Sequence, residues 1–273
     1  MIIDAHAHAC GELHNIDGIL KYLANNQLDK IVLCPGESEQ TKNRKVPMIS
    51  NIIHSSGLGY GFNNVIRLAT SLSGVAKYID KQNQIIACLA NDYHEKIIQA
   101  YWVNPLDNEC IQKLESCYET HHFHILKMHQ CWHNFDILQN KVEIILEWAL
   151  NKSVPIFMHL LSKKQSIKFA ELTNKFPKSM FIVGHMIGFE DIITNSTNEN
   201  IFFDISAPYL IPFKILQKAV SIIGSNRLIL GSDTPYGENN IKINFDRIGN
   251  LGLNDRQQEN IMGNNFINIL HAN

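Results

Sequence analysis

The sequence predicts an α/β protein, a single-domain (β/α)8 barrel of the TIM type, and two observations lead to this prediction. Eight short apolar runs with strand character are spread over the 273 residues, and stretches with helical periodicity separate them. Such a barrel usually needs about 250 residues, and neither a linker nor an internal repeat interrupts the alternation here. We therefore expect residues 1–273 to form one domain. A doubly wound open sheet is the alternative fold, but no Gly-x-Gly-x-x-Gly motif follows an early run.

The first expected strand covers residues 1–8, where Ile2 and Ile3 are followed by polar residues that alternate with alanine. Residues two apart in a strand point to the same face, so Asp4, His6 and His8 are expected to share one face. Two imidazoles at this spacing can chelate one metal ion, and the alternative is a pair of hydrogen-bonded, inert histidines. For Asp4 we expect a buried, hydrogen-bonded carboxylate one layer below the site.

The other strands and the helices alternate along the rest of the chain. Strands are expected at residues 29–34, 96–103, 123–129, 154–159, 180–185, 200–205 and 227–233. Helices are expected at residues 15–26, 65–92 with a break near 80, 107–119, 136–151, 163–175, 190–195 and 212–223, with a final helix or pair over 239–269.

A long polar stretch, residues 37–64, follows the second expected strand. Its length favours a functional loop, with disorder as the alternative. Loops that follow barrel strands lie on the active face, so we expect this one over the mouth of the barrel. Gly57, Gly59 and Gly61 are candidates for its hinge.

Polar residues end several of the expected strands. Barrel enzymes place their chemistry at the carboxyl ends of the strands, which converge at one rim. Imidazoles with one or two carboxylates suit Zn²⁺, and also Mn²⁺ or Fe²⁺, and a metal with an open position polarises a carbonyl and activates water. The residues concerned are His6 and His8 on the first strand, Lys127 and His129 on the fourth, His159 on the fifth, His185 on the sixth and Asp233 on the eighth.

These segments resemble the amidohydrolase superfamily, and most closely its amidohydrolase family 2 branch. The matching segments are IDAHAH at residues 3–8, LKMH at 126–129, PIFMH at 155–159, VGH at 183–185, LGSDTP at 230–235, and the tail at 251–253 and 261–270. Each motif is weak alone, but together and in this order they are specific, and they span nearly the whole chain. The resemblance implies a metal-dependent barrel enzyme.

The resemblance implies one divalent metal ion, with Zn²⁺ the first choice and Mn²⁺ the alternative, held by His6, His8, His159 and Asp233. It also implies that Asp233 takes a proton from the attacking water and that His185 contacts the substrate or that water. The branch contains hydrolases of lactones and amides, and non-oxidative decarboxylases. We therefore expect a hydrolase of a small amide, lactone or ester, with a decarboxylase as the alternative and a non-catalytic metal-binding barrel as a less favoured one.

Lys127 has two interpretations under this resemblance. In binuclear members a carboxylated lysine on the fourth strand bridges two ions, and His159 and His185 would then bind the second. We favour one metal and a charged Lys127 that binds a carboxylate of the substrate. His129 on the same strand, Trp102 at the end of the third and Tyr236 after the eighth are further candidates for substrate binding.

Composition limits the class of partner. The formal net charge is −2, so no large positive surface is expected for nucleic acid, and no apolar run is long enough to span a membrane. The six cysteines contain no Cys-x-x-Cys pair, and no signal peptide precedes them, so we expect reduced thiols in a cytoplasmic protein. The expected partner is a small molecule. If Lys127 is charged, as we favour, this molecule carries a carboxylate. The sequence leaves open whether the chain forms a homo-oligomer.

Overall fold

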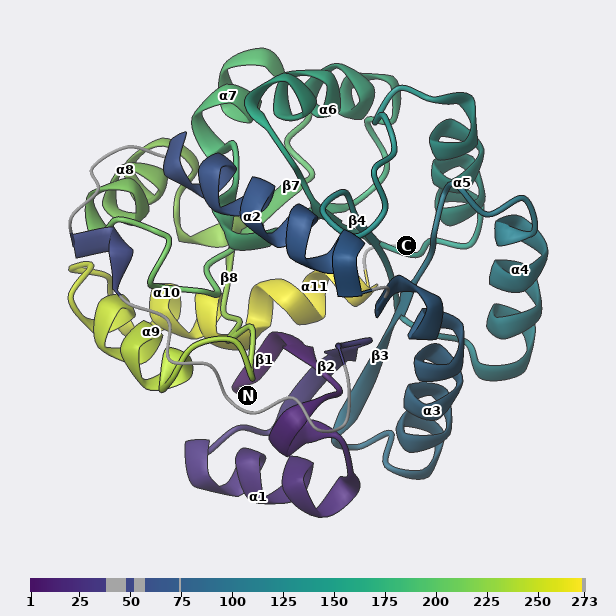
Figure 1. Ribbon diagram of the computed structural model, residues 1–273. Coiled ribbons are helices and arrows are strands. Elements are labelled where there is room, and N and C mark those ends of the chain that lie inside the picture. Colours follow the sequence, from purple (N-terminus) through teal and green to yellow (C-terminus); the bar gives the residue numbers. More distant parts are fainter. Residues whose placement is uncertain (38–47, 52–56, 74, 272–273) are drawn as a thin grey trace.

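The computed structural model describes residues 1–37, 48–51, 57–73 and 75–271, and it shows eight parallel strands surrounded by helices (Figure 1). Each strand pairs with the next in the order of the sequence, so the predicted single-domain (β/α)8 barrel is confirmed. The strands are β1 (Ile3–His8), β2 (Lys30–Cys34), β3 (Ile97–Trp102), β4 (Ile125–His129), β5 (Ile156–His159), β6 (Phe181–Val183), β7 (Ile201–Asp204) and β8 (Leu228–Ile229).

Most helices lie between strands and cover the outside of the barrel. They are α1 (Ile16–Asn26), α2 (Gly57–Ser73), α3 (Ile79–Asp92), α4 (Cys110–His121), α5 (Asn140–Asn151), α6 (Lys163–Lys175), α7 (Phe189–Asn195), α8 (Phe213–Ile223), α9 (Asn240–Gly249), α10 (Asp255–Glu259) and α11 (Asn265–His271). Short turns of 3-10 or π helix are η1 (Gly11–Leu13), η2 (Ile49–Asn51), η3 (Val75–Tyr78), η4 (Gly184–Met186), η5 (Ser225–Arg227) and η6 (Asn260–Asn264). Within the described ranges, the helices are too short or too polar to cross a membrane.

Backbone hydrogen bonds between β1 and the segment after β8 close the barrel. Ala5 N donates to Leu230 O at 3.0 Å, Asp233 N to His6 O at 2.7 Å, and His8 N to Thr234 O at 2.8 Å. The eighth strand was expected over residues 227–233, but β8 ends at Ile229. The chain turns at Asp233, whose φ is 62°, so regular pairing stops while these single bonds continue.

Asp4 was expected to share a face of β1 with His6 and His8, and this prediction is wrong because β1 contains a bulge. The pairing of β1 with β2 shifts register between Asp4 and Ala7, so strict alternation does not hold there. Asp4 points outward, where it accepts hydrogen bonds from Tyr22 Oη of α1 at 2.9 Å and from Ser232 N at 2.9 Å. Asp4 is thus a buried, hydrogen-bonded carboxylate, as expected, but it lies outside the barrel rather than below the site.

The segment after β2 differs from the loop expected over residues 37–64. It is helical from Gly57 onward, and α2 lies across the mouth of the barrel (Figure 1). Gly57, Gly59 and Gly61 fall in this helix, although glycine is a weak helix former, and their action as a hinge stays a prediction. Residues 38–47 and 52–56 of the expected loop lie outside the described ranges.

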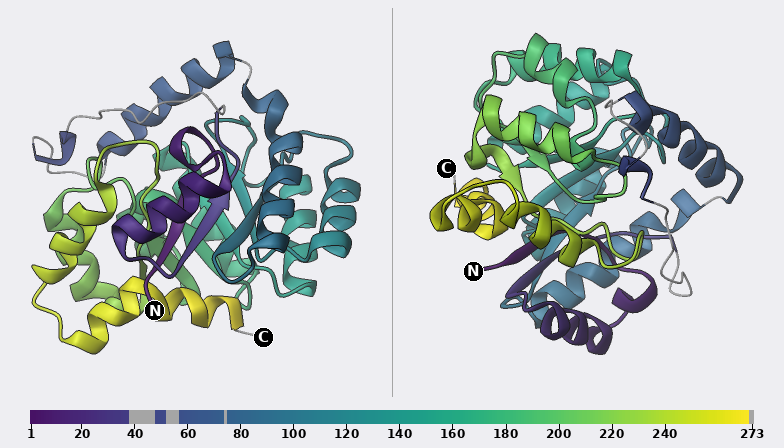
Figure 2. Two further views of the ribbon diagram at one scale, coloured as in Figure 1. Left: turned by 90° about the horizontal axis from the view of Figure 1, so that it is seen from below. Right: turned by 90° about the vertical axis from the view of Figure 1, so that its left-hand side faces the viewer.

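Two apolar layers hold the barrel together. The outer layer fills the space between strands and helices, and the inner layer fills the barrel itself. Phe266 and Ile269 of α11 belong to the inner layer, where they pack with Ile3, Ile125 and other inward residues. Figure 2 shows α11, in yellow, across the end of the barrel opposite to α2. The inner layer therefore closes the bottom and leaves the other end for the site.

Phe266→Ala tests the role of α11 as the base of the barrel. The side chain is 1% exposed, so its removal leaves a cavity, and we expect the free energy of unfolding to fall by about 3–5 kcal/mol in urea titrations. Asn268→Ala, at an exposed position of the same helix, should change it by no more than about 0.5 kcal/mol. A loss below about 1 kcal/mol for Phe266→Ala would contradict this role.

Candidate metal centre and cavity

A cavity of about 250 Å³ lies at the carboxyl ends of the strands, beneath α2. Most of the site residues predicted from the sequence line it, namely His8, His129, His159, His185, Asp233 and Tyr236. Its remaining walls come from Glu37, Trp132, Tyr209, Leu210, and Val65, Ile66 and Thr70 of α2. Sites for drug-sized ligands begin at about 300 Å³, so this cavity suits a somewhat smaller molecule.

Three of the four predicted metal ligands meet at one side of this cavity. Asp233 Oδ1 lies 3.3 Å from His8 Nε2 and 3.6 Å from His6 Nε2. Nitrogen and oxygen atoms bound to one tetrahedral Zn²⁺ lie about 3.4 Å apart, given metal–ligand distances of about 2.0–2.2 Å. The separations in the structure therefore fit a single metal ion held by His6, His8 and Asp233.

The hydrogen bonds of the two imidazoles leave the correct nitrogen free. His8 Nδ1 donates to Pro35 O at 2.6 Å, and His6 Nδ1 donates to Asp204 Oδ2 at 2.9 Å. In the neutral imidazoles the Nε2 atoms that approach Asp233 carry the lone pairs, as a metal ligand requires. His8, whose pKa is raised to about 9, would lose its Nε2 proton on binding an ion. Burial, and after it the charge of Lys127, holds the pKa of His6 well below its ordinary value, so His6 is neutral.

His159, the fourth predicted ligand, lies on the opposite side of the cavity from β1. Its Nε2 pairs with Asn63 Oδ1 of α2 at 3.0 Å, and its ring stacks on that of His129 with centroids 3.8 Å apart. Its buried Nδ1 has no hydrogen-bond partner among the described residues. His159 therefore has a free metal-binding atom, and its ring lies 5.0 Å from that of His185, which in turn lies next to His6 and Asp233. Its role as a ligand stays a prediction.

Asp204 organises the site from the end of β7, and the sequence analysis did not select it. Its Oδ2 accepts from His6 Nδ1 at 2.9 Å, from His185 N at 3.2 Å and from Ser206 Oγ. Ser206 Oγ also lies 2.9 Å from His185 Nδ1. Asp204 is the last residue but one of the strand expected over residues 200–205, and a carboxylate near a strand end is the signal that could have identified it.

Lys127 lies beneath the cavity and does not line it. Its Nζ donates to His6 Nε2 at 2.7 Å and to Cys34 Sγ at 3.1 Å, and its side chain is 1% exposed. The rings of Trp102 and Phe157 flank the amino group at 5.1 and 4.9 Å from their centroids. Direct binding of a substrate carboxylate, as expected from the sequence, would require Nζ to leave these partners.

Cys34, at the end of β2, is a second site residue that the sequence did not assign. The sequence predicts it only as one of six reduced thiols, but its Sγ lies 3.6 Å from His8 Nδ1 as well as next to Lys127. Burial alone would lower the pKa of His8 and raise that of Cys34. The charge that Cys34 carries when ionised nevertheless raises the pKa of His8 to about 9, and the positive charges of His8 and Lys127 lower the pKa of Cys34.

The remaining candidates differ in their access to the cavity. His185 approaches Asp233 from η4, with its Nε2 4.0 Å from Asp233 Oδ2. Tyr236 lies edge-on to His8, with ring centroids 5.2 Å apart. Trp102 is fully buried and supports His129 by stacking at 5.2 Å, so it shapes the cavity without lining it.

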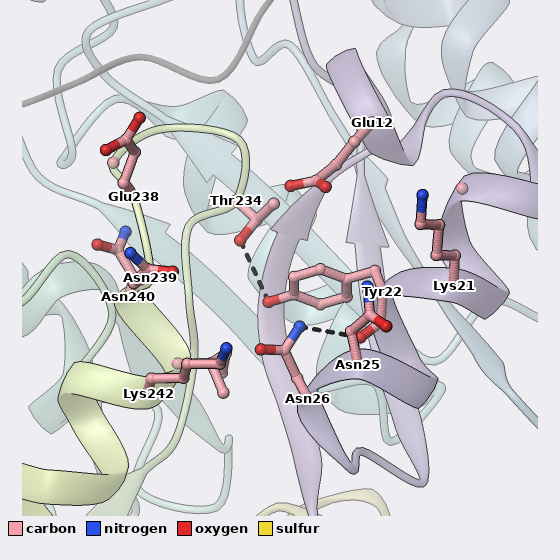
Figure 3. Close-up of a pocket in the computed structure, with 13 residues that line it drawn as sticks. Glu12, Lys21, Tyr22, Asn25, Asn26, Thr234, Glu238, Asn239, Asn240 and Lys242 are labelled. Atoms are coloured by element: carbon pink, nitrogen blue, oxygen red, sulfur yellow. Dashed lines mark hydrogen bonds between the residues drawn. The ribbon is translucent and has the colours of Figure 1, made fainter.

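A second, larger hollow of about 630 Å³ lies between α1 and the segment that precedes α9 (Figure 3). Amides, two lysines and two glutamates line much of it, and none of its described lining residues is a histidine or a cysteine. Tyr22 Oη lies 3.2 Å from Thr234 Oγ1 at its inner edge. This hollow therefore lacks the histidines that line the cavity at the mouth of the barrel, and that cavity remains the candidate site.

Comparisons with known proteins agree with this fold. The sequence model of the family described as Amidohydrolase matches residues 76–268. A putative amidohydrolase from Staphylococcus aureus is similar in structure, with a TM-score of 0.71, 16% identity, and 99% of each chain covered. So is a probable 2-pyrone-4,6-dicarboxylic acid hydrolase from Acinetobacter baumannii with citric acid bound, with a TM-score of 0.69, 12% identity, and 99% of each chain covered.

A dihydroxybenzoic acid decarboxylase from Polaromonas sp. JS666, with bound manganese and the inhibitor 2-nitroresorcinol, is also similar. Its TM-score is 0.71 at 13% identity, with 99% of this chain and 96% of that chain covered. No sequence among the curated proteins matches the chain. At these identities the structural likeness shows the fold alone.

Asp204→Asn tests whether this carboxylate holds His6 in place. The amide cannot accept all the hydrogen bonds that Asp204 accepts, and it removes the charge behind the imidazole, so we expect affinity for Zn²⁺ to fall by about 10- to 100-fold. Competition with a chelating dye measures it. Asp136→Asn, whose carboxylate is 46% exposed and pairs with Lys168, is the control and should leave it unchanged. Equal affinity in Asp204→Asn would contradict this role.

Proposed function

Because the chain belongs to the Amidohydrolase family, we propose that it is a metal-dependent hydrolase of a small amide, lactone or ester. One observation supports this most strongly: His6, His8 and Asp233 converge at distances that fit one metal ion, beside a cavity large enough for a small molecule. His159 is the fourth ligand expected from the sequence. A divalent ion held there would supply Lewis acidity to water and to a substrate carbonyl.

The two oxygens of Asp233 have different surroundings, which suits a residue with two tasks. Oδ1 faces His6 and His8, whereas Oδ2 accepts from Tyr209 Oη at 3.4 Å and lies 4.0 Å from His185 Nε2. Burial would raise the pKa of Asp233, but its interactions with His185 and His8 lower it below its ordinary value. The carboxylate is therefore ionised and can take the proton of the attacking water through Oδ2.

His185 is placed to receive that proton. Ser206 Oγ donates to Asp204, so it accepts from His185 Nδ1–H and leaves Nε2 free toward the cavity. The proton passes from water to Asp233, then to His185 Nε2, and finally to the leaving nitrogen or oxygen. While protonated, His185 donates to the oxyanion that forms at the attacked carbonyl.

A decarboxylase is the second candidate, and the rings around the cavity favour it. Trp132, Tyr209, Tyr236 and His129 line the walls, so a planar aromatic acid would pack well there. An ion held by the same residues would then supply positive charge to the substrate's carboxylate or hydroxyl oxygens, and His185 or Asp233 would move a proton to the carbon that loses carbon dioxide. Both reactions use one set of residues.

The metal content tests the premise of either reaction. We expect elemental analysis of protein purified without chelator, and supplemented with Zn²⁺ or Mn²⁺, to give one ion per chain, and Lys127→Met to retain it. Two ions per chain, falling to one or none in Lys127→Met, would instead support the binuclear site with a carboxylated Lys127. A stoichiometry near zero would contradict the proposed function.

The products of turnover decide between the two reactions. We expect a panel of lactones, amides, esters and aromatic acids, incubated in ¹⁸O-labelled water, to yield a carboxylate product that carries the label. Asp233→Asn serves as the inactive control. Release of carbon dioxide without incorporation of label would identify a decarboxylase. Metal-loaded protein that turns over no compound of the panel would favour the non-catalytic barrel.

A further inference from the structure

We propose that Cys34 supplies a thiolate ligand to this metal centre, which then takes Zn²⁺ or Co²⁺ in preference to Mn²⁺. The inference rests on the proposed metal-binding function and adds a ligand that neither the family resemblance nor the sequence motifs provide. Cys34 ends β2, next to β1, so its side chain reaches the same rim as His6 and His8.

The distances place Cys34 within the donor set. Ligand atoms of His6, His8 and Cys34 all lie within 4.8 Å of one another, and all three side chains are buried. Cys34 Sγ is 3.9 Å from His8 Nε2. Sulfur and nitrogen atoms bound to one tetrahedral Zn²⁺ lie about 3.6 Å apart, given Zn–S and Zn–N distances of about 2.3 and 2.0–2.1 Å. Because Sγ is also 3.6 Å from His8 Nδ1, it lies beside the ring, and the Cys34 side chain must move toward the Nε2 end to bind an ion held by His8.

The position of Lys127 shows that these donors point to one place. Its Nζ is within hydrogen-bonding distance of both His6 Nε2, at 2.7 Å, and Cys34 Sγ, at 3.1 Å. A donor group of the chain thus lies between the nitrogen and the sulfur, where a cation would be bound by both. Metal binding would displace this amino group, release the Cys34 thiol proton to solvent, and form a metal–sulfur bond.

His159 is less well placed for the same role. Its Nε2 is already paired with Asn63, and its ligand atom lies within 4.8 Å of those of His129 and Cys131. With His6, His8 and Asp233, Cys34 would complete a set of two nitrogens, one oxygen and one sulfur. Thiolate ligands favour Zn²⁺ over the harder Mn²⁺, which explains the preference that we infer.

Cobalt substitution tests the inference, because a thiolate bound to Co²⁺ gives an intense near-ultraviolet charge-transfer band. We expect the band in the Co²⁺-loaded protein and its loss in Cys34→Ser, with Co²⁺ still bound. Cys110→Ser, which removes a buried thiol at the start of α4, is the matched control and should keep the band. His159→Asn should keep it as well.

A competition between Zn²⁺ and Mn²⁺ gives a second readout. We expect Cys34→Ser to shift the ratio of bound ions toward Mn²⁺ by roughly tenfold or more. Co²⁺ bound by the unaltered protein without the band would overturn the role of Cys34 and leave the proposed function intact, whether or not the serine variant folds. Absence of any bound ion in the unaltered protein would overturn both.

Discussion

The hydrogen bond from Asp233 N to His6 O, 2.7 Å long, is the interaction on which the site depends most. It belongs to the group of bonds that closes the barrel, and it also brings the eighth strand's carboxylate against the first strand's histidines. Gly231 allows this close approach, because a Cβ there would lie 2.4 Å from Asp204 Oδ1 and 3.0 Å from His6 Cβ. The same contacts therefore close the fold and bring the proposed metal ligands together.

The cost of this arrangement is a polar cluster buried in an apolar shell. Asp204 and Asp233 are buried next to His6, and Lys127 donates a hydrogen bond to the same histidine. Asp4 is buried just outside the barrel, where it accepts from Ser232 N. Isolated charges in such a place would be costly, so Asp4 and Asp204 each accept several hydrogen bonds, and Asp233 accepts one from Tyr209. Asp4 also shows the limit of this compensation, because burial raises its pKa to about 7. A metal ion would add positive charge where the carboxylates face it.

Strand ends were predictable from the sequence because a barrel brings them together whatever the loops do. His8, His159, His185 and Asp233 accordingly line one cavity. The outward position of Asp4 was not predictable, since the bulge after it has no signature in an alternating sequence. Cys34 and Asp204 were overlooked for another reason. Each is an ordinary residue at a strand end, and its importance appears only when its neighbours across the barrel are known.

The helix after β2 connects the ends of β4 and β5 to the space that a substrate would fill. Asn63 of α2 accepts from His159 Nε2 and donates to Leu160 O at 2.7 Å, while Thr70 Oγ1 donates to Cys131 O at 2.9 Å. The helix is thus anchored to the ends of β4 and β5.

Val65 and Ile66 lie between these two anchors and form a wall of the cavity. The wall that would contact the substrate's body is therefore positioned by the strand ends that carry the chemistry. A change in the sequence of α2 could alter the shape of the cavity while His6, His8 and Asp233, which are fixed by the closure of the barrel, keep their geometry. This separation of a fixed ligand set from a replaceable wall is how one barrel can serve several small-molecule reactions.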